Sequence, residues 1–352
     1  MRDTQNFWSA CESLPGLAAV EFEWKARAGA DYNLWKPFLR PRQESASSIP
    51  CKSEHPCGCR HRVVDHGNGR IVAVCRCEPS ACESFAVIRE DLTVYELYLG
   101  RLSATIAKAL SLQSMRSTIP GIRKTELIGI DSPTKGFDFP VYLTYQYDPE
   151  DFRQVLLTLK ATTGNPFILI TPTDTWYQAD CRTLMDSSGS LFLTIPDILS
   201  PMDTGKIRVN PTAADLLKRF HERILPNNNR ASMKVFFETP SNATWSDVYI
   251  AFRSSHTVTI SVKSQHGDYS YTNMGMADGR TGDPNMQWEL LYAFAQRRGI
   301  LDWDHPDANK KNKKRKEMLS QSLRDFFRID NEPFFYDKET KGWTALFHIE
   351  PE

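Results

Sequence analysis

The chain has 352 residues, of which 41% are hydrophobic and 24% charged, a composition typical of a globular protein with room for two or three hydrophobic cores. Its 43 Lys and Arg residues balance 43 Asp and Glu residues, so attraction to nucleic acid has to come from local clusters of charge. The N-terminus lacks a basic start followed by an apolar core, and no apolar run approaches roughly 18 residues, so we expect a cytoplasmic protein with no membrane contact.

Residues 1–48 mix strand-like and helix-like stretches, with large apolar side chains that include Trp24, Trp35 and Phe38. These side chains predict that the segment packs on a later part of the chain. The polar stretch PRQESASSIP then predicts a short linker into the next segment.

Six of the eight cysteines fall between Cys51 and Cys82, in two groups that flank the β-branched runs RVV and RIVAV. The sequence DHGNG between these runs predicts the turn of a β-hairpin, which would bring the two groups together. The hairpin resembles a zinc ribbon. Four thiolate or imidazole ligands would hold Zn²⁺ and stabilise a module, residues 49–90, that is too small to fold on apolar burial alone.

The preferred ligands of this structural zinc are Cys51, Cys59, Cys75 and Cys82. The alternative ligands are Cys57, Cys77, His55 and His61. Alternatives stay open because the spacings C-x₅-C-x-C and C-x-C-x₄-C differ from the usual C-x₂-C pairs. Six thiolates could also bind a two-metal or iron–sulfur cluster. In a secreted chain, the same six cysteines would be expected to form three disulfides. A cytosolic chain favours thiolates and metal.

The pattern over residues 91–225 predicts a central α/β domain. Apolar residues from Leu92 to Leu110 have broadly helical spacing, and the strand-like runs ELIGI and PVYLTYQY follow. A helix begins near Pro149, with Asp148 as its N-cap and Gly164 as its terminator. The runs PFILITP and LFLTIP and a helix over 211–225 complete a small open sheet, and the asparagine-rich 226–232 predicts a linker.

The loop TPTDTW follows a buried strand, which is where α/β folds place ligands. No nucleotide-binding or nucleophile motif accompanies it. Thr171, Thr173 and Asp174 are therefore expected to form a capped turn. An enzyme with its active site in this domain, such as a nuclease or nucleotide-processing component, is an alternative function.

Residues 233–352 begin with three strand-like runs, MKVFFE, DVYIAFR and TVTISV, followed by a helix, NMQWELLYAFAQRRG, that Gly299 terminates. The basic run KKNKKRK then precedes an amphipathic helix, EMLSQSLRDFFRI, whose inward residues are Leu319, Leu323, Phe326 and Phe327. The chain ends in the hairpin pattern EPFFYD, KETKG, WTALFHIE.

This order of helix, basic connection, second helix and terminal hairpin resembles a winged helix of the type found in the DNA-binding domain of OmpR response regulators. The resemblance covers about 100 residues from roughly Trp245 onward. It implies that Gln321, Arg324 and Arg328 enter the major groove, and that Lys338 and Lys341 of the turn lie along phosphates or in the minor groove. The long connection DWDHPDANKKNKKRK departs from the family, and no receiver domain precedes the strands, so phosphorelay control is not implied.

The charge pattern also indicates DNA binding independently of the resemblance. Basic side chains at the start of a helix are repelled by the positive end of the helix dipole, and binding of a polyanion would offset this unfavourable interaction. The basic residues concerned are Lys310, Lys311, Lys313, Lys314, Arg315 and Lys316.

We thus expect an α+β multidomain protein with a zinc-ribbon-like module, a central α/β sheet domain and a C-terminal winged helix. Its expected function is to bind double-stranded DNA, as a transcriptional regulator or as the DNA-targeting subunit of an assembly. A protein partner, a homo-oligomer or a protein-interaction scaffold is also compatible with the sequence.

Overall fold

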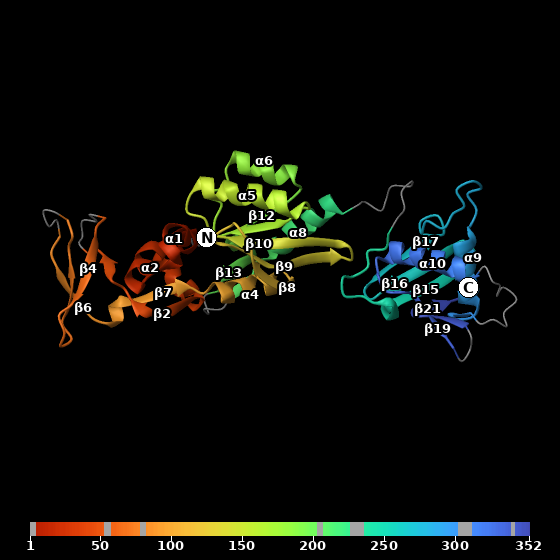
Figure 1. Cartoon of the computed structure of the whole chain (residues 1–352), viewed down its shortest axis with the longest axis horizontal. Helices are drawn as coiled ribbons and strands as arrows, with labels where there is room; N and C mark the ends of the chain where they lie inside the picture. Colours follow the sequence, from red (N-terminus) through yellow and green to blue (C-terminus); the bar gives the residue numbers. More distant parts are fainter. Residues whose placement is uncertain are drawn as a thin grey trace. The chain divides into compact units, whose positions relative to one another are not determined.

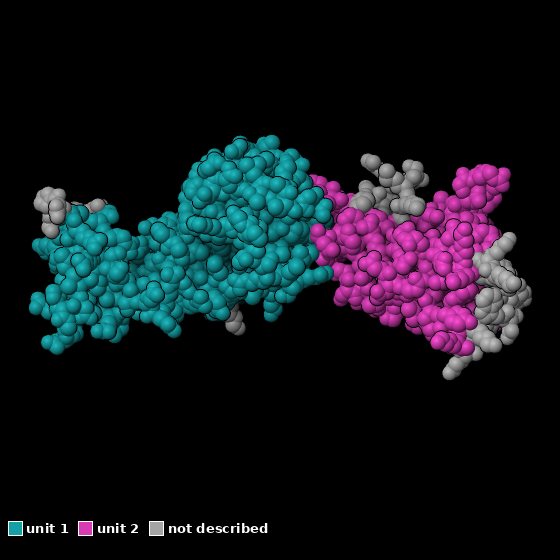
Figure 2. Space-filling view, in the orientation of Figure 1, with its two compact units in different colours: residues 1–131, 139–220 teal, residues 132–138, 221–352 magenta. Residues whose placement is uncertain are grey.

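The chain is described from a computed structural model. The described residues are 5–52, 58–77, 82–202, 207–225, 236–301, 312–338 and 342–352. They form a mixed α/β structure with several sheets, which divides into two compact units (Figures 1 and 2). Unit 1 comprises Met1–Asp131 and Phe139–Phe220, and unit 2 comprises Ser132–Asp138 and His221–Glu352. None of the described helices is long and apolar enough to cross a membrane.

Unit 1 begins with an aromatic core formed by its first helices. Phe7, Trp8, Trp24 and Trp35 are fully buried, with ring centroids 4.7–6.0 Å apart. The helices are α1 (Gln5–Ser13), α2 (Glu21–Ala28) and α3 (Tyr32–Trp35). Short 3₁₀ helices are η1 (Pro15–Leu17), η2 (Gly29–Asp31), η3 (Lys36–Phe38), η4 (Glu90–Leu92) and, in unit 2, η5 (Trp245–Asp247).

Two expectations for this part of the chain are wrong. The polar stretch is not a linker, because it supplies β2 (Leu39–Ser45) and β3 (Ser48–Pro50). The helix expected from Leu92 is a strand in its first half, β7 (Thr93–Leu97), before α4 (Leu99–Ala109) begins. Strand β7 pairs with β1 (Ala18–Val20) on one side and β2 on the other, and these backbone pairings override the helical spacing of its apolar residues.

The cysteine-rich segment forms the expected hairpin. Strand β4 (Arg60–Asp65) pairs antiparallel with β5 (Ile71–Val74), and Gly67 and Gly69 both have positive φ in the turn, which favours glycine. With β3 and β6 (Phe85–Val87) they form a four-stranded sheet in the order β3-β4-β5-β6. Its small core contains Val20, Ile49, Ile71, Ala73, Val87 and Leu92.

The central sheet has the order β12-β11-β10-β9-β8, and β10, β11 and β12 are parallel. Its strands are β8 (Gln113–Thr118), β9 (Thr125–Thr134), β10 (Phe137–Thr144), β11 (Ile168–Thr171) and β12 (Leu191–Thr194). Helices α5 (Pro149–Thr163) and α6 (Ala179–Ser187) cover one face (Figure 1). The side chain of Asp148 accepts a hydrogen bond from the Asp151 amide, and Gly164 is left-handed, so both predicted caps of α5 are confirmed.

Beyond β12, the chain packs α8 against the sheet. The segment contains α7 (Ile195–Ile198), β13 (Leu199–Pro201), β14 (Ile207–Val209) and α8 (Pro211–Ile224). Phe220 of α8 lies edge-on to Phe139 of β10, at 5.0 Å between ring centroids. The predicted linker 226–232 lies outside the described residues.

Unit 2 is built on a four-stranded sheet with the order β17-β16-β15-β21, in which β21 runs parallel to β15. Its strands are β15 (Val248–Ser254), β16 (Thr257–Val262), β17 (Gln265–Ser270) and β21 (His348–Glu350). A second sheet, in the order β18-β20-β19, contains β18 (Ile300–Leu301), β19 (Phe334–Asp337) and β20 (Gly342–Ala345). Helices α9 (Met286–Gln296) and α10 (Asn312–Phe327) complete the unit.

Three sequence expectations for unit 2 differ from the structure. Residues 236–238 of the run MKVFFE are not a strand, although Phe237 is buried in the core. Helix α10 begins earlier than expected and includes Lys313–Lys316. The final run WTALFHIE splits between β20 and β21, because the chain leaves the hairpin to pair with β15.

The four predicted inward residues of α10 are all buried, with Leu319, Leu323 and Phe327 at 0% exposure and Phe326 at 3%. They join the apolar side of β15 and β16 and the buried face of α9 in one core. The apolar face of α10 is therefore confirmed as the face that the fold covers.

We predict that Leu323→Ala lowers the free energy of unfolding of unit 2 by about 2–5 kcal/mol, because it leaves a cavity in this core. Met318→Ala, at a position of α10 that is 48% exposed, should change it by less than about 0.5 kcal/mol. Hydrogen exchange of the α10 amides reports on unit 2 directly. Equal losses of protection in both variants would contradict the burial described here.

Candidate metal centre and charged helix

The β4–β5 hairpin places cysteines from distant positions side by side in unit 1. The sulfur of Cys59, just before β4, lies 3.7 Å from that of Cys82 and 4.0 Å from that of Cys75. Two sulfurs that bind one tetrahedral Zn²⁺ at about 2.3 Å are separated by about 3.8 Å. The spacing between Cys59 and Cys82 thus matches one edge of a tetrahedral site.

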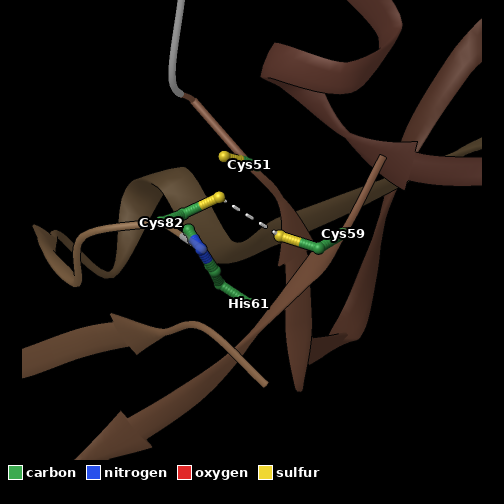
Figure 3. Close-up of side chains that lie close together, drawn as sticks. All are labelled: Cys51, Cys59, His61 and Cys82. Atoms are coloured by element: carbon green, nitrogen blue, oxygen red, sulfur yellow. Dashed lines mark hydrogen bonds between the residues drawn. The ribbon is translucent and has the colours of Figure 1, made fainter. Parts of the chain in front are cut away.

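The possible ligands form two groups that share Cys59. Ligand atoms of Cys51, Cys59, His61 and Cys82 all lie within 4.8 Å of one another (Figure 3). Those of Cys59, Cys75 and Cys77 form the second group, in which the Cys77 amide donates to the Cys75 sulfur at 3.4 Å. Three of the four preferred ligands thus share a group, while Cys75 lies in the other. Cys57 and His55 lie outside the described residues.

His61 is the best-placed residue that the preferred set omitted. It is 0% exposed, and among the described residues neither of its ring nitrogens has a hydrogen-bond partner. Its ring packs edge-on to Phe85, at 5.1 Å between centroids. A buried polar group without a partner costs free energy, and coordination of a metal by one nitrogen would remove part of that cost. This Cys/His cluster can therefore hold a metal ion.

An ion pair between Arg60 and Glu23 also connects the hairpin to α2. Arg60 of β4 donates through one Nη to both carboxylate oxygens of Glu23, at 3.1 Å each. Glu23 is only 6% exposed, and Arg27 reaches the same carboxylate from one turn along α2. A buried carboxylate needs such partners. The candidate metal cluster thus sits on a sheet anchored to the aromatic core.

The loop TPTDTW after β11 is occupied by structural hydrogen bonds. The amide and hydroxyl of Thr173 both donate to the carboxylate of Glu12, and the Thr171 hydroxyl donates to the Thr173 carbonyl. Glu12 comes from α1 and is 7% exposed. Burial raises its pKa, although the hydrogen bonds from Thr173 oppose this effect. Nothing in the sequence near Glu12 signals this contact with the loop.

The basic residues predicted to bind DNA fall into two sets. Lys313, Lys314, Arg315 and Lys316 belong to the first turns of α10, whereas Lys310, Lys311 and Lys341 lie outside the described residues. Within the described part of unit 2, Lys313, Lys314 and Arg315 form no ion pair, while Lys316 pairs with Glu332 at 2.8 Å. Lys338 is exposed after β19.

The predicted base-reading residues of α10 are held by neighbours within unit 2. Gln321 donates to Asp325 at 2.7 Å and accepts from Arg324, which also approaches Glu332 at 3.5 Å. Burial of Glu332 alone would raise its pKa, but the hydrogen bonds from Lys316 and Ser320 lower it overall. The carboxylate of Glu332 thus neutralises part of the positive face of α10.

Arg328 follows α10 with a left-handed backbone, and its guanidinium lies over two neighbouring aromatic rings. Its guanidinium carbon is 4.3 Å from the ring centroid of Phe137 and 4.2 Å from that of Phe236. Burial lowers the pKa of this guanidinium. Contact with two aromatic faces stabilises this position of the cation. The geometry gives Arg328 a packing role.

Comparisons with protein-family models, with curated proteins and with solved structures found no match to this chain.

We predict that Glu12→Gln changes the pH dependence of stability. Because folding raises the pKa of Glu12, its stabilising contribution is complete below the ordinary value of 4.5 and is lost as pH rises through the folded-state pKa. The variant should therefore become more stable relative to the parent chain between pH 4.5 and neutrality. Thermal unfolding across this range measures the difference, with the exposed Glu44→Gln as control. A difference that does not vary with pH would contradict the raised pKa.

Proposed function

We propose that the chain binds double-stranded DNA through unit 2, with the first turns of α10 meeting the phosphate backbone. The observation that carries this proposal is the set of three basic side chains, Lys313, Lys314 and Arg315, that form no ion pair with the described residues. Lys313 and Lys314 are exposed and Arg315 is partly exposed. The proposed role is that of a regulator or a DNA-targeting subunit.

Electrostatics supports this proposal. Unpaired cations at the start of a helix interact unfavourably with the helix dipole, at about 0.3–1 kcal/mol each. The phosphates of DNA would attract both these cations and the positive end of the helix dipole, and binding would release counterions from the DNA. The other partly exposed basic residues on the outward side of the helix, Lys316 and Arg324, already contact Glu332. The positive charges of this helix that can still bind an external anion are therefore those of its first turn.

The order of elements also supports a winged-helix arrangement. Helix α9, the short strand β18, helix α10 and the β19–β20 hairpin follow one another, so the two helices and the hairpin have the order that the resemblance implies, and α10 buries its apolar face. Gln321 and Arg324 would have to exchange their contacts with Asp325 and Glu332 for contacts with bases. We therefore propose that phosphate contacts supply most of the affinity and that base contacts follow a rearrangement of these side chains.

The triple variant Lys313→Gln, Lys314→Gln, Arg315→Gln tests the DNA proposal. Loss of three phosphate contacts should weaken binding to a duplex of about 20 base pairs by tenfold or more and reduce the slope of log K against log salt concentration by about 2 to 3. Fluorescence anisotropy of the labelled duplex with the full chain, repeated at several salt concentrations, measures both quantities.

A matched control removes three charges from α8, where Lys218 and Arg219 belong to unit 1 and Arg223 to unit 2. The variant Lys218→Gln, Arg219→Gln, Arg223→Gln should bind the duplex as the parent chain does. If both triple variants weaken binding equally, the first turn of α10 has no special role. If the parent chain does not bind the duplex at low salt, the DNA proposal is wrong.

We further propose that the cluster on the β4–β5 hairpin binds one structural Zn²⁺ through Cys51, Cys59, His61 and Cys82. The support is the buried His61, whose ring nitrogens lack partners among the described residues, beside three sulfurs in the same group. Three thiolates and one imidazole form a closed tetrahedral set with no open position for a substrate. Such an ion would cross-link strands whose shared core is small.

This ligand set predicts different outcomes for His61 and Cys75. His61→Cys should keep one metal ion per chain and convert an S₃N site into an S₄ site, which changes the visible absorption of the Co²⁺-loaded chain. Cys75→Ser should leave the Co²⁺ spectrum and the stoichiometry unchanged. The reverse pattern would support Cys75 as the ligand, and two metal ions per chain would contradict a single site.

A further inference from the structure

A cavity of about 700 Å³ opens in unit 2 between the start of α9 and the first turns of α10. Its lining residues are Ala277, Asp278, Gly279, Asn285, Met286, Gln287, Lys314, Arg315 and Met318. This volume lies in the range of sites that hold small organic ligands. All lining residues belong to the same unit, so the cavity belongs to one compact body.

The apolar part of the lining consists largely of two methionines that the core leaves uncovered. Met286 is 41% exposed and Met318 is 48% exposed. Methionine side chains are flexible and polarisable, so they adapt to ligands of different shapes. Two such side chains facing one cavity provide a surface for an apolar group.

The cavity wall also carries the side-chain amide of Gln287. Gln287 is 9% exposed, and its side chain makes no hydrogen bond with the described residues. Its amide atoms are not among the buried side-chain atoms that lack a partner, so they keep some exposure and are open to a group bound in the cavity. The amide can donate to an anionic oxygen and accept from a hydroxyl.

The charge of the cavity is positive at the α10 wall. Lys314 and Arg315 contribute two cations with no ion pair in the described part of the unit. The carboxylate of Asp278 is engaged by the amides of Arg280 and Thr281, and these backbone hydrogen bonds lower its pKa. Asn285 already caps the first amides of α9, so recognition of an anion falls to the side chains.

We propose that this cavity binds an amphipathic organic anion. Its carboxylate, or a comparable acidic group, would lie between Lys314 and Arg315 within reach of Gln287. Its apolar chain or ring would lie on Met286 and Met318. Charge complementarity selects an anion over a neutral molecule of the same shape, and the methionines select an apolar body over a simple inorganic ion. This inference does not rest on the DNA proposal.

Decanoate is a suitable probe, and titration calorimetry with the full chain in the absence of DNA measures its binding. We expect saturable binding of one decanoate per chain. The double variant Lys314→Gln, Arg315→Gln should weaken binding tenfold or more, because it removes both charged partners of the carboxylate. Lys313→Gln lies in the same turn but outside the cavity lining and should bind decanoate as the parent chain does.

Two further measurements keep the inference testable if the double variant is unstable. Met318→Ser should weaken decanoate binding, whereas Phe335→Ser, at an exposed apolar position of β19, should not. Decanol should bind at least tenfold more weakly than decanoate. Absence of saturable decanoate binding, equal binding of decanol, or equal loss in Met318→Ser and Phe335→Ser would overturn the proposal.

Discussion

The burial of one face of α10 is the constraint on which the surface of unit 2 depends. Leu319, Leu323 and Phe327 are fully covered by the β15–β16 sheet and α9, so the rotation of the helix about its own axis is set. Side chains on the opposite face must then point outward. The basic first turn, the contacts of Glu332 and the wall of the cavity follow from that one packing arrangement.

A second constraint acts in the cysteine-rich sheet of unit 1, where little apolar area is available. Its core consists of a few small and medium-sized side chains, and two other interactions supplement it. Arg60 joins β4 to the buried Glu23, and the Cys/His cluster gathers ligands from both sides of the hairpin. A metal ion bound there would restrain the same strands that apolar burial holds weakly.

The end of α10 shows why a basic residue on a polar helix face need not contact a ligand. Arg328 has a left-handed backbone and lies on the rings of Phe137 and Phe236. Gly136 lies beside it with a φ of +76°, a backbone conformation that favours glycine, and a Cβ there would lie 2.9 Å from a guanidinium nitrogen of Arg328. Phe137 and Phe236 are far from Arg328 in the sequence, so the periodicity of the helix gives no sign of this contact. Periodicity by itself places Arg328 on the solvent-exposed face.

Interactions between neighbours in the chain could be predicted from the sequence. They include the hairpin turn at Gly67 and Gly69, the caps of α5 at Asp148 and Gly164, and the buried stripe of α10, since each depends on residues a few positions apart. Only the tertiary structure decided that His61 joins Cys51, Cys59 and Cys82, that β7 is a strand, and that Glu12 caps a loop 161 residues away. These outcomes depend on which distant segments are brought together by packing of the cores, and local sequence patterns do not encode that choice.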